Sequence, residues 1–292
     1  LCPLRGHSAP PFPPLPFERD LSVIGPMARG AADLALLLDV IAGPDPIEAG
    51  VGYKLALPAS RHPDFKGFRV LVLDSHPLLP VAAEVRAAVD TLARNLAGKG
   101  VSVARETPLL PDLAATTRLY MRMLMSFLAG SFTPEVYAGA QAAAAQLAPN
   151  DMSLAAERLR GITLGHRDWV MCNAGRTRLR AQWRDLFKAF DAVICPIMPT
   201  PAYPHDHLPD QEQRRIAIDG KLFPYTDQLA WPGIATLPGL PATAIPVGRS
   251  KDGLPIGVQI VGPWLEDRTP LKLAALIERE FGGFTPPPLF ED

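Results

Sequence analysis

Hydrophobic positions along the chain switch repeatedly between a helical and a strand-like period. Near the N-terminus, Asp33 begins a ladder of apolar residues at helical spacing, and Gly43-Pro44 ends it. The ladder consists of Leu34, Leu37, Leu38 and Ile41. The pattern predicts a buried helix with clear start and stop signals inside the segment Leu21–Pro46.

A strand–helix–strand unit follows this helix. The apolar run Phe68–Asp74 predicts a strand, Val81–Ala97 has helical spacing, and Val101–Glu106 predicts a second strand. Two strands joined through a helix normally lie parallel, with a right-handed crossover. The unit therefore predicts a parallel pair of strands.

The middle of the chain has helical spacing from Asp112 to Phe190. Turn-forming residues interrupt the spacing and divide the region into several helices. The predicted breaks lie near Ser131–Pro134, Pro149–Met152 and Gly161.

The last third of the chain returns to strand patterns. Asp191–Ile197 is apolar enough for a buried strand, and it leads into a proline-rich loop. Ala242–Gly248 and Pro255–Gly262 flank a turn at Lys251-Asp252-Gly253, which predicts a hairpin. Arg268–Phe281 closes the chain as an amphipathic helix. A parallel pair together with a hairpin predicts an α/β fold with a mixed sheet flanked by helices.

Composition narrows the classes of partner. The 292 residues are 48% hydrophobic and carry a net charge of −1 with no sustained basic run, so no nucleic-acid partner is expected. Charged residues or prolines break every apolar run well short of a bilayer span, so no membrane partner is expected either. The three cysteines are odd in number and far apart, which favours the reducing cytoplasm over a disulfide framework.

Four segments, in this order, resemble the amidase signature family over nearly the whole chain. They are LSVIGPMARGAADLALLLDVIAGPDP (Leu21–Pro46), DAVICPIMPTPAYP (Asp191–Pro204), WPGIATLPGLPATAIPVG (Trp231–Gly248) and GLPIGVQIVGP (Gly253–Pro263). The resemblance implies that residues 1–292 are the C-terminal part of a single amidase signature domain. Its mixed sheet would then be incomplete on its N-terminal side.

The resemblance also implies a chemistry. Enzymes of this family hydrolyse carboxylic amides without metal or other cofactor, through a Lys–cis-Ser–Ser triad whose nucleophile lies in a Gly/Ser-rich loop. This sequence has no Gly-Gly-Ser-Ser-Gly-Gly run, its nine serines are isolated from one another, and it lacks a G-x-S-x-G elbow. We therefore assign no catalytic residue to this chain and expect the triad upstream of Leu1.

The proline-rich loop supplies candidates for a substrate wall. Its prolines would hold Thr200 and Tyr203 in a stiff frame, as a rigid pocket requires. Met121 and Met125 lie in a helical stretch, where core packing is the commoner role of methionine and an apolar acyl pocket is the alternative. The substrate-binding candidates are Thr200, Tyr203, Trp231, Met121 and Met125. Gln259 lies mid-strand, where a buried amide must be hydrogen-bonded, so we expect it to order the sheet rather than to act in catalysis.

Other polar residues in the sequence give weaker indications of a functional site. His205-Asp206-His207 has metal-ligand spacing, but no third ligand is visible, which favours a solvated loop. A serine hydrolase built from a dispersed serine, His207 and Asp210 stays open, although nothing marks the nucleophile.

Three functions therefore remain in view. The first is an amidase acting on a small-molecule amide, of which this chain alone would be inactive. The second is a catalytically empty binding or scaffold protein, and the third is an ammonia-transferring subunit of the amidotransferase A type. An incomplete sheet would leave an edge and an apolar face uncovered. We therefore expect a homodimer or association with the missing N-terminal half.

Overall fold

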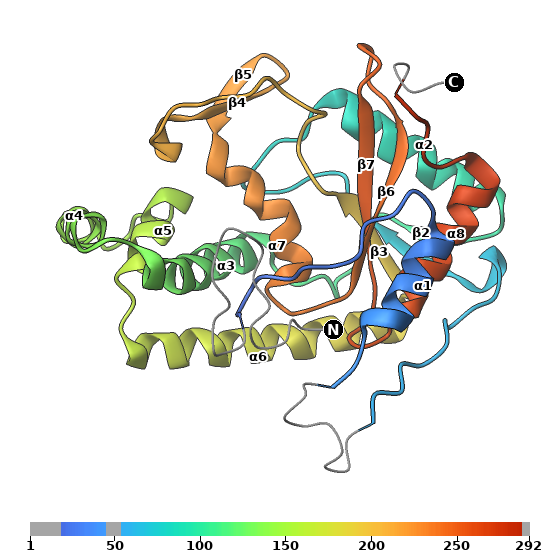
Figure 1. Ribbon diagram of the computed structural model, residues 1–292, viewed down its shortest axis with the longest axis horizontal. Coiled ribbons are helices and arrows are strands. Elements are labelled where there is room, and N and C mark those ends of the chain that lie inside the picture. Colours follow the sequence, from blue (N-terminus) through green and yellow to red (C-terminus); the bar gives the residue numbers. More distant parts are fainter. Residues whose placement is uncertain (1–18, 45–53, 288–292) are drawn as a thin grey trace.

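The computed structural model describes residues 19–44 and 54–287, which form a mixed sheet with helices on both faces (Figure 1). The main sheet has five strands in the order β2-β1-β3-β7-β6. These strands are β1 (Arg69–Val72), β2 (Ser102–Ala104), β3 (Ala192–Pro196), β6 (Ala242–Arg249) and β7 (Pro255–Val261). β1 runs parallel to both β2 and β3, whereas β7 runs antiparallel to both β3 and β6. The predicted mixed sheet, parallel pair and hairpin are all confirmed.

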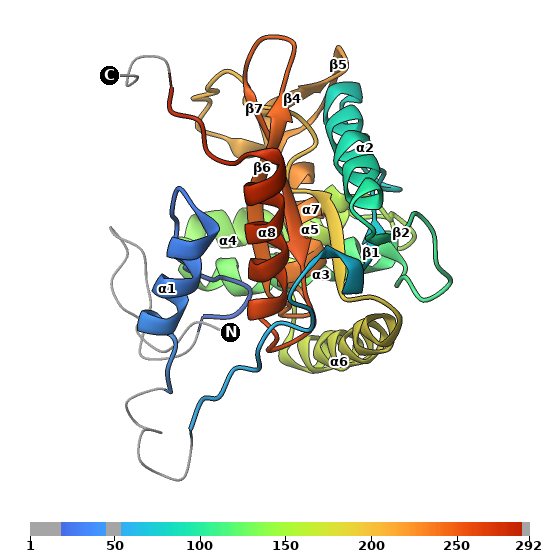
Figure 2. The same cartoon turned by 90° about the vertical axis from the view of Figure 1, so that its right-hand side faces the viewer.

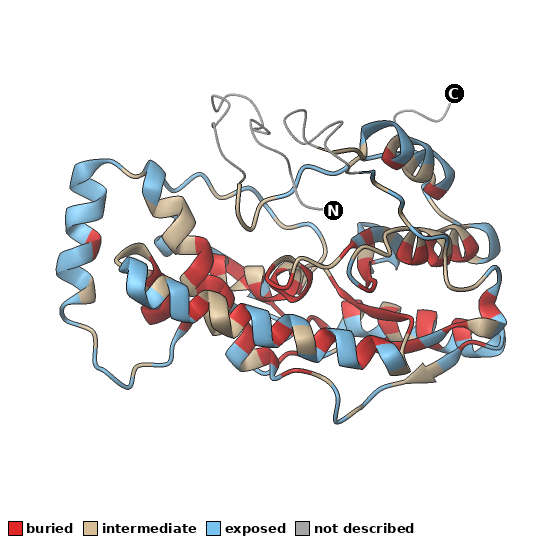
Figure 3. Cartoon of the chain, turned by 90° about the horizontal axis from the view of Figure 1, so that it is seen from below, coloured by how far each residue is buried: buried red, intermediate tan, exposed pale blue. Residues whose placement is uncertain are grey.

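Each face of the sheet packs against its own set of helices. On one face, Val70, Ile194 and Ile260 lie in a core with α2 (Ala83–Gly98) and α8 (Arg268–Phe281). On the other face, strand residues such as Leu71, Val193 and Cys195 pack with three helices. Those helices are α3 (Leu113–Leu128), α6 (His166–Ala189) and α7 (Ala230–Thr236). Buried residues accordingly concentrate along the sheet and the inner sides of these helices (Figure 3).

The helical middle is divided as predicted, into α3, α4 (Pro134–Ala144), α5 (Leu154–Ile162) and α6. Gly161 lies where α5 crosses α3, and a Cβ there would lie 2.4 Å from the carbonyl oxygen of Arg122. Only glycine permits this close approach. Short 3₁₀ turns occur at η1 (Phe65–Gly67), η2 (Ala129–Ser131), η3 (Gln211–Gln213) and η4 (Tyr225–Leu229).

Two elements between β3 and β6 were not predicted. A separate hairpin pairs β4 (Arg215–Ile218) with β5 (Lys221–Pro224), and α7 follows it. The hairpin turns at Asp219 and Gly220, which both have positive φ. This pair is a strong hairpin signal in the sequence. In α7, Pro232 lies in the first turn, where its missing N–H costs no helical hydrogen bond.

The predicted helix near the N-terminus is present as α1 (Ala31–Ile41), but its apolar ladder is buried only in part. Leu38 is 8% exposed and Leu34 and Leu37 are half-buried, whereas Ile41 is 56% exposed. The reason is that α1 packs on α8, outside the layer that covers the sheet (Figure 2). Glu278 of α8 accepts a hydrogen bond from the first main-chain N–H of α1 at 2.7 Å. Residues 45–46, the end of the predicted segment, lie outside the described residues.

The strand β6 forms one edge of the main sheet within the described residues. The main-chain N–H of Gly262 donates to the carbonyl oxygen of Pro241 at 2.8 Å. Because hydrogen-bonding direction alternates in antiparallel pairs, Ala242 and Ala244 direct their main-chain groups away from β7. Both residues are exposed. The expected uncovered edge is therefore present.

Candidate functional site

The carboxyl ends of β1 and β3 lie side by side and send out the loops of the candidate site. The main-chain N–H of Leu73 donates to the carbonyl oxygen of Ile194 at 2.9 Å, and that of Ala82 donates to Pro199 at 2.8 Å. The two loops are thus joined to each other. In open α/β sheets, ligands bind at the carboxyl ends of parallel strands.

Gln259 fixes the position of the loop after β3. It is 5% exposed, and its Nε2 donates to the carbonyl oxygens of Pro196 at 3.2 Å and Trp231 at 2.9 Å. One amide therefore joins β7, the end of β3 and the start of α7. The prediction of a buried, hydrogen-bonded amide that orders the sheet is confirmed. Beside it, burial raises the pKa of the Cys195 thiol to about 12, which leaves that thiol unreactive.

Two of the predicted wall residues lie in this loop. Thr200 is half-buried, and its hydroxyl donates to the carbonyl oxygen of Pro201 at 2.8 Å. The Tyr203 hydroxyl donates to Oε1 of Gln228 at 3.2 Å, and its ring meets that of Tyr225 edge-on at 6.2 Å. Burial, together with the neighbouring Tyr225, raises the pKa of Tyr203, so its hydroxyl is a neutral donor. The structure thus gives both side chains fixed positions.

The other three predicted wall residues lie in packed regions. Trp231 and Met121 are both fully buried, and Met125 is half-buried where α3 meets α5 at Gly161. None of the three lines either of the two best-defined cavities among the described residues. Among the described residues, no hydrogen bond or ring contact links these three side chains to Thr200 or Tyr203, and their contact with substrate stays a prediction.

His76 is a polar residue near this site that was not predicted. Its Nδ1 accepts from the main-chain N–H of Leu78 at 3.1 Å, so its Nε2 carries the proton and faces the Thr117 hydroxyl, also at 3.1 Å. Its ring meets that of Trp231 edge-on at 5.4 Å. Burial lowers the pKa of His76 to about 4, so the ring is neutral at physiological pH. A lone histidine after a strand offers no pattern that would have marked it.

The β4–β5 hairpin is held by a buried arginine that was also missed. Arg158 of α5 is 4% exposed and binds Glu212 through Nε and Nη2 at 3.1 and 2.7 Å. Its Nη1 donates to Asp227 at 3.0 Å. Glu212 precedes the hairpin and Asp227 follows it, so one guanidinium anchors both ends. Its partners are more than fifty residues away in sequence, which hides the cluster from local patterns.

A cavity of about 620 Å³ lies between the 203–209 loop and this hairpin, and we call it the hairpin groove. Its lining residues are Tyr203–Pro209, Arg215–Ala217 and Leu222. His205 and His207 are exposed, as expected for a solvated loop. Over the described ranges, no three metal-ligating side chains gather into a possible site, and no lysine is hydrogen-bonded to a serine. No helix in these ranges is long and apolar enough to cross a bilayer.

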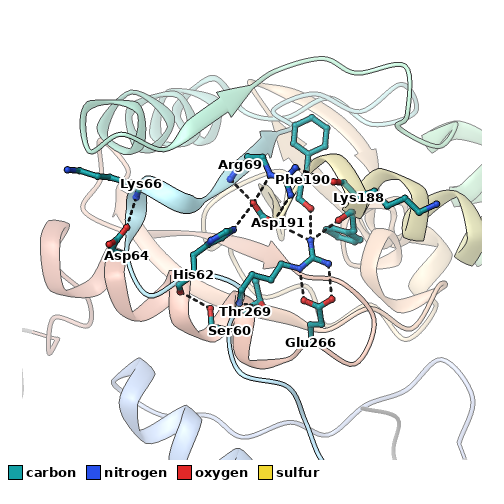
Figure 4. Close-up of polar contacts among 12 residues, drawn as sticks. Ser60, His62, Asp64, Lys66, Arg69, Lys188, Phe190, Asp191, Glu266 and Thr269 are labelled. Carbon is teal, nitrogen blue, oxygen red and sulfur yellow. Dashed lines mark hydrogen bonds and ion pairs between the residues drawn. The ribbon is translucent and has the colours of Figure 1, made fainter.

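The opposite end of β3 holds a separate ionic cluster. Asp191 is 1% exposed and accepts hydrogen bonds from Nε and Nη2 of Arg69 at 3.0 and 2.9 Å (Figure 4). It also accepts from Nη1 of Arg61 at 3.2 Å, and Arg61 in turn binds both oxygens of Glu266. The cluster joins segments distant in sequence at the start of β3, away from the candidate site at its end.

Comparison with solved structures agrees with this architecture. The crystal structure of an amidase aligns with a TM-score of 0.58 and 22% identity, covering 87% of this chain and 52% of that chain. A bacterial aryl acylamidase of the amidase signature family aligns with a TM-score of 0.60 and 19% identity, covering 87% of this chain and 52% of that chain. At these identities the likeness shows a common fold.

Sequence comparison extends this result. The A subunit of glutamyl-tRNA(Gln) amidotransferase from Koribacter versatilis is 28% identical over 284 residues, which are 90% of this chain and 56% of that protein. The corresponding protein from Thermus thermophilus is 29% identical, over 90% of this chain and 56% of that protein. The chain thus spans about half the length of these curated relatives. Because the family model described as Amidase matches residues 3–271, the chain belongs to the amidase (amidase signature) family.

Proposed function

We propose that the protein containing this chain hydrolyses linear carboxylic amides through a serine nucleophile that lies outside these 292 residues. The observation that carries the proposal is the family match over residues 3–271 in a chain that has no Gly/Ser-rich nucleophile loop. Relatives that are nearly twice as long leave room for that loop elsewhere in the protein. We further propose that residues 1–292 are part of a single amidase signature domain.

In this proposal the chain supplies sheet strands and pocket walls. Gln259 holds the loop after β3, and Gln228 holds Tyr203, so the wall is rigid before a substrate arrives. A fixed wall lowers the entropic cost of orienting a small amide for attack. Neutral His76 and unreactive Cys195 offer neither a cation nor a thiolate that would compete with a serine mechanism.

The open edge at β6 supports association with the remainder of the protein. Within the part of the chain that the structure describes, Ala242 and Ala244 present main-chain groups without a strand partner and small exposed side chains. A strand from elsewhere can pair there without steric obstruction. We infer that the missing half occupies this edge, with a second copy of the chain as the alternative, and that the protein is cytoplasmic. Hydrogen exchange compares the two: slow exchange at the amides of Ala242 and Ala244 in monomers of the intact protein supports the first, and slow exchange in dimers alone supports the second.

The decisive experiment labels the nucleophile. The intact protein is treated with a fluorophosphonate, and the modified serine is located by mass spectrometry. We expect one labelled serine outside residues 1–292 and loss of ammonia release from simple linear amides in the same sample. A label on any of the nine serines of this chain, or turnover that survives full labelling, would contradict the proposal.

A second function is favoured by the names of the curated relatives, which are amidotransferase A subunits. An ammonia-transferring role predicts that amide cleavage depends on partner subunits and an acceptor substrate. Hydrolysis of simple amides at the same rate with and without such partners favours the amidase. Absence of both activities favours the third candidate, a binding or scaffold protein.

A further inference from the structure

The hairpin groove has the size and lining of a small-molecule site, and we propose that it binds a small carboxylate with an apolar body. Its volume of about 620 Å³ falls within the range typical of ligand pockets. The inference goes beyond amide hydrolysis, because binding in the groove requires no catalytic group, although the groove shares Tyr203 with the proposed substrate wall.

The lining is mostly apolar. Ile216 is fully buried at the base, while Leu208 and Leu222 are 46% and 71% exposed. Pro204 and Pro209 add rigid apolar surface from the opposite loop. A leucine as exposed as Leu222 beside a cavity gains free energy when an apolar ligand covers it. The body of the ligand is therefore aliphatic or aromatic.

The charged groups of the lining select the head group of the ligand. Arg215 donates through Nη1 to the carbonyl oxygens of Glu212 and Arg214 at 2.7 and 2.8 Å, which holds its guanidinium in place. No carboxylate in the described part of the chain lies within ion-pair distance of Arg215. Asp206 is the acidic residue of the lining, and its Oδ1 already accepts from the main-chain N–H of Leu208 at 3.0 Å. Asp227 interacts electrostatically with Arg215 from beyond ion-pair distance. A positioned guanidinium that makes no contact ion pair is complementary to a carboxylate.

Two imidazoles add hydrogen-bonding capacity to the lining of the same groove. The rings of His205 and His207 lie edge-on with centroids 5.7 Å apart, and both line the groove. A neutral imidazole still has one N–H donor. The two histidines therefore supply further N–H donors to a carboxylate bound in the groove.

Both walls of the groove are fixed by contacts behind them. Arg158 anchors the hairpin at its two ends, and the main-chain N–H of Tyr225 donates to Arg214 at 3.1 Å. On the opposite wall, Tyr203 is held by Gln228. The hairpin stands next to α7, apart from the five-stranded sheet (Figure 1). The groove is thus formed before a ligand arrives, which lowers the cost of binding.

The test is calorimetric titration of the intact protein with three probes that share one apolar body. They are 4-phenylbutanoate, 4-phenylbutan-1-ol and 4-phenylbutylamine. We expect the carboxylate to bind roughly tenfold more tightly than the alcohol, and the amine to bind most weakly. Arg215→Gln should weaken binding of the carboxylate by about tenfold and leave binding of the alcohol unchanged.

Matched controls separate the groove from the rest of the protein. Arg118 also donates to a main-chain carbonyl, that of Met152 at 2.9 Å, so Arg118→Gln should leave all three affinities unchanged. Leu222→Ser should weaken the carboxylate and the alcohol alike, whereas the exposed Leu109→Ser should weaken neither. Because Arg215 and Leu222 are exposed, their replacement preserves the fold, which an unchanged melting temperature confirms.

Three results would overturn the proposal. Equal affinity for the carboxylate and the alcohol would show that Arg215 does not bind the head group of the ligand. Carboxylate binding that survives Arg215→Gln would place the ligand elsewhere, such as at the reacting centre, where an acid product would bind. If Arg118→Gln weakened carboxylate binding as much as Arg215→Gln does, the effect would come from the net charge of the protein and not from a site at Arg215. The fluorophosphonate experiment is independent of all three, so the proposed hydrolysis can fail while this site stands.

Discussion

Asp191→Asn tests how strongly the ionic cluster at the start of β3 stabilises the fold. The native carboxylate accepts hydrogen bonds from Nε and Nη2 of Arg69, from Nη1 of Arg61 and from the main-chain N–H of Arg69 at 2.9 Å. An asparagine has almost the same volume but carries no charge, and it turns two N–H donors toward guanidinium donors. The substitution therefore removes the ionic partner without creating a cavity.

The exposure of each partner sets the size of the effect. Removing one member of a buried ion pair typically costs about 3–5 kcal/mol of unfolding free energy. Here the side chain of Asp191 is 1% exposed, but those of Arg69 and Arg61 are 44% and 25% exposed, so water solvates the stranded guanidiniums in part. Glu266 also remains to pair with Arg61. We therefore expect a loss near the lower limit, about 3 kcal/mol.

Urea unfolding of the intact protein measures this loss, with Asp90→Asn as the matched control. The side chain of Asp90 is 45% exposed and pairs with Arg94 and Arg105 on the surface, so its replacement should cost less than about 1 kcal/mol. Equal losses in the two variants would refute the reasoning.

The pH dependence offers a second readout. Burial would raise the pKa of Asp191, but hydrogen bonds from Arg69 and Arg61 outweigh it and hold the pKa below the ordinary value of 3.8. The carboxylate therefore stabilises the fold above that value and loses its effect as pH falls through the lower native pKa. Asparagine does not titrate in this range, so acidification below about pH 4 should destabilise Asp191→Asn less than the native protein.

Three further substitutions test other parts of the fold. Because His76 has a pKa of about 4 in the native state against 6.5 when unfolded, unfolding takes up a proton between these values. Stability should fall by up to about 3 kcal/mol as pH drops through this range, and His76→Gln should flatten the curve in urea titrations at pH 7.5 and 5. Gly161→Ala should lower the free energy of unfolding, measured by thermal unfolding, by about 1–3 kcal/mol, because the new Cβ collides with the Arg122 carbonyl oxygen. The control Gly139→Ala, where the space is open, should stabilise the fold slightly. Gln259→Leu removes a donor from each of two buried main-chain carbonyls and should cost about 2 kcal/mol, and an intact near-UV spectrum with no loss of stability would contradict it.

The order of the main elements could be predicted from the sequence because their hydrophobic periods are long and clean. Strand β3 is buried at every position, and its sequence is accordingly an unbroken apolar run. The end of α2 is marked in the sequence by a Gly-Lys-Gly turn. The burial of α1 could not be predicted, because the same apolar ladder fits a core helix and an outer helix. What decides between them is α8, more than two hundred residues later in the chain.

The candidate site was predicted only in part, for a related reason. Tyr203 and Thr200 could be found because prolines mark their loop locally. Their supports could not, because Gln228 and Arg158 act through partners from other elements. Met121 shows a second limit of local patterns: a methionine at helical spacing packs in a core more often than it lines a pocket, and here it is fully buried.

The two edges of the main sheet show where this fold is open to a partner. At one edge, β2 has three residues and its ladder ends almost at once, as is typical of a protected edge. At the other, β6 runs for eight residues, and Pro246 interrupts its outward N–H groups only near the middle. The exposed side chains before that proline are two alanines, which leave room for another strand. Among the described residues, one edge is thus short and the other is long and accessible, which supports the proposal that the protein associates through β6, next to the strand whose Gln259 orders the candidate site.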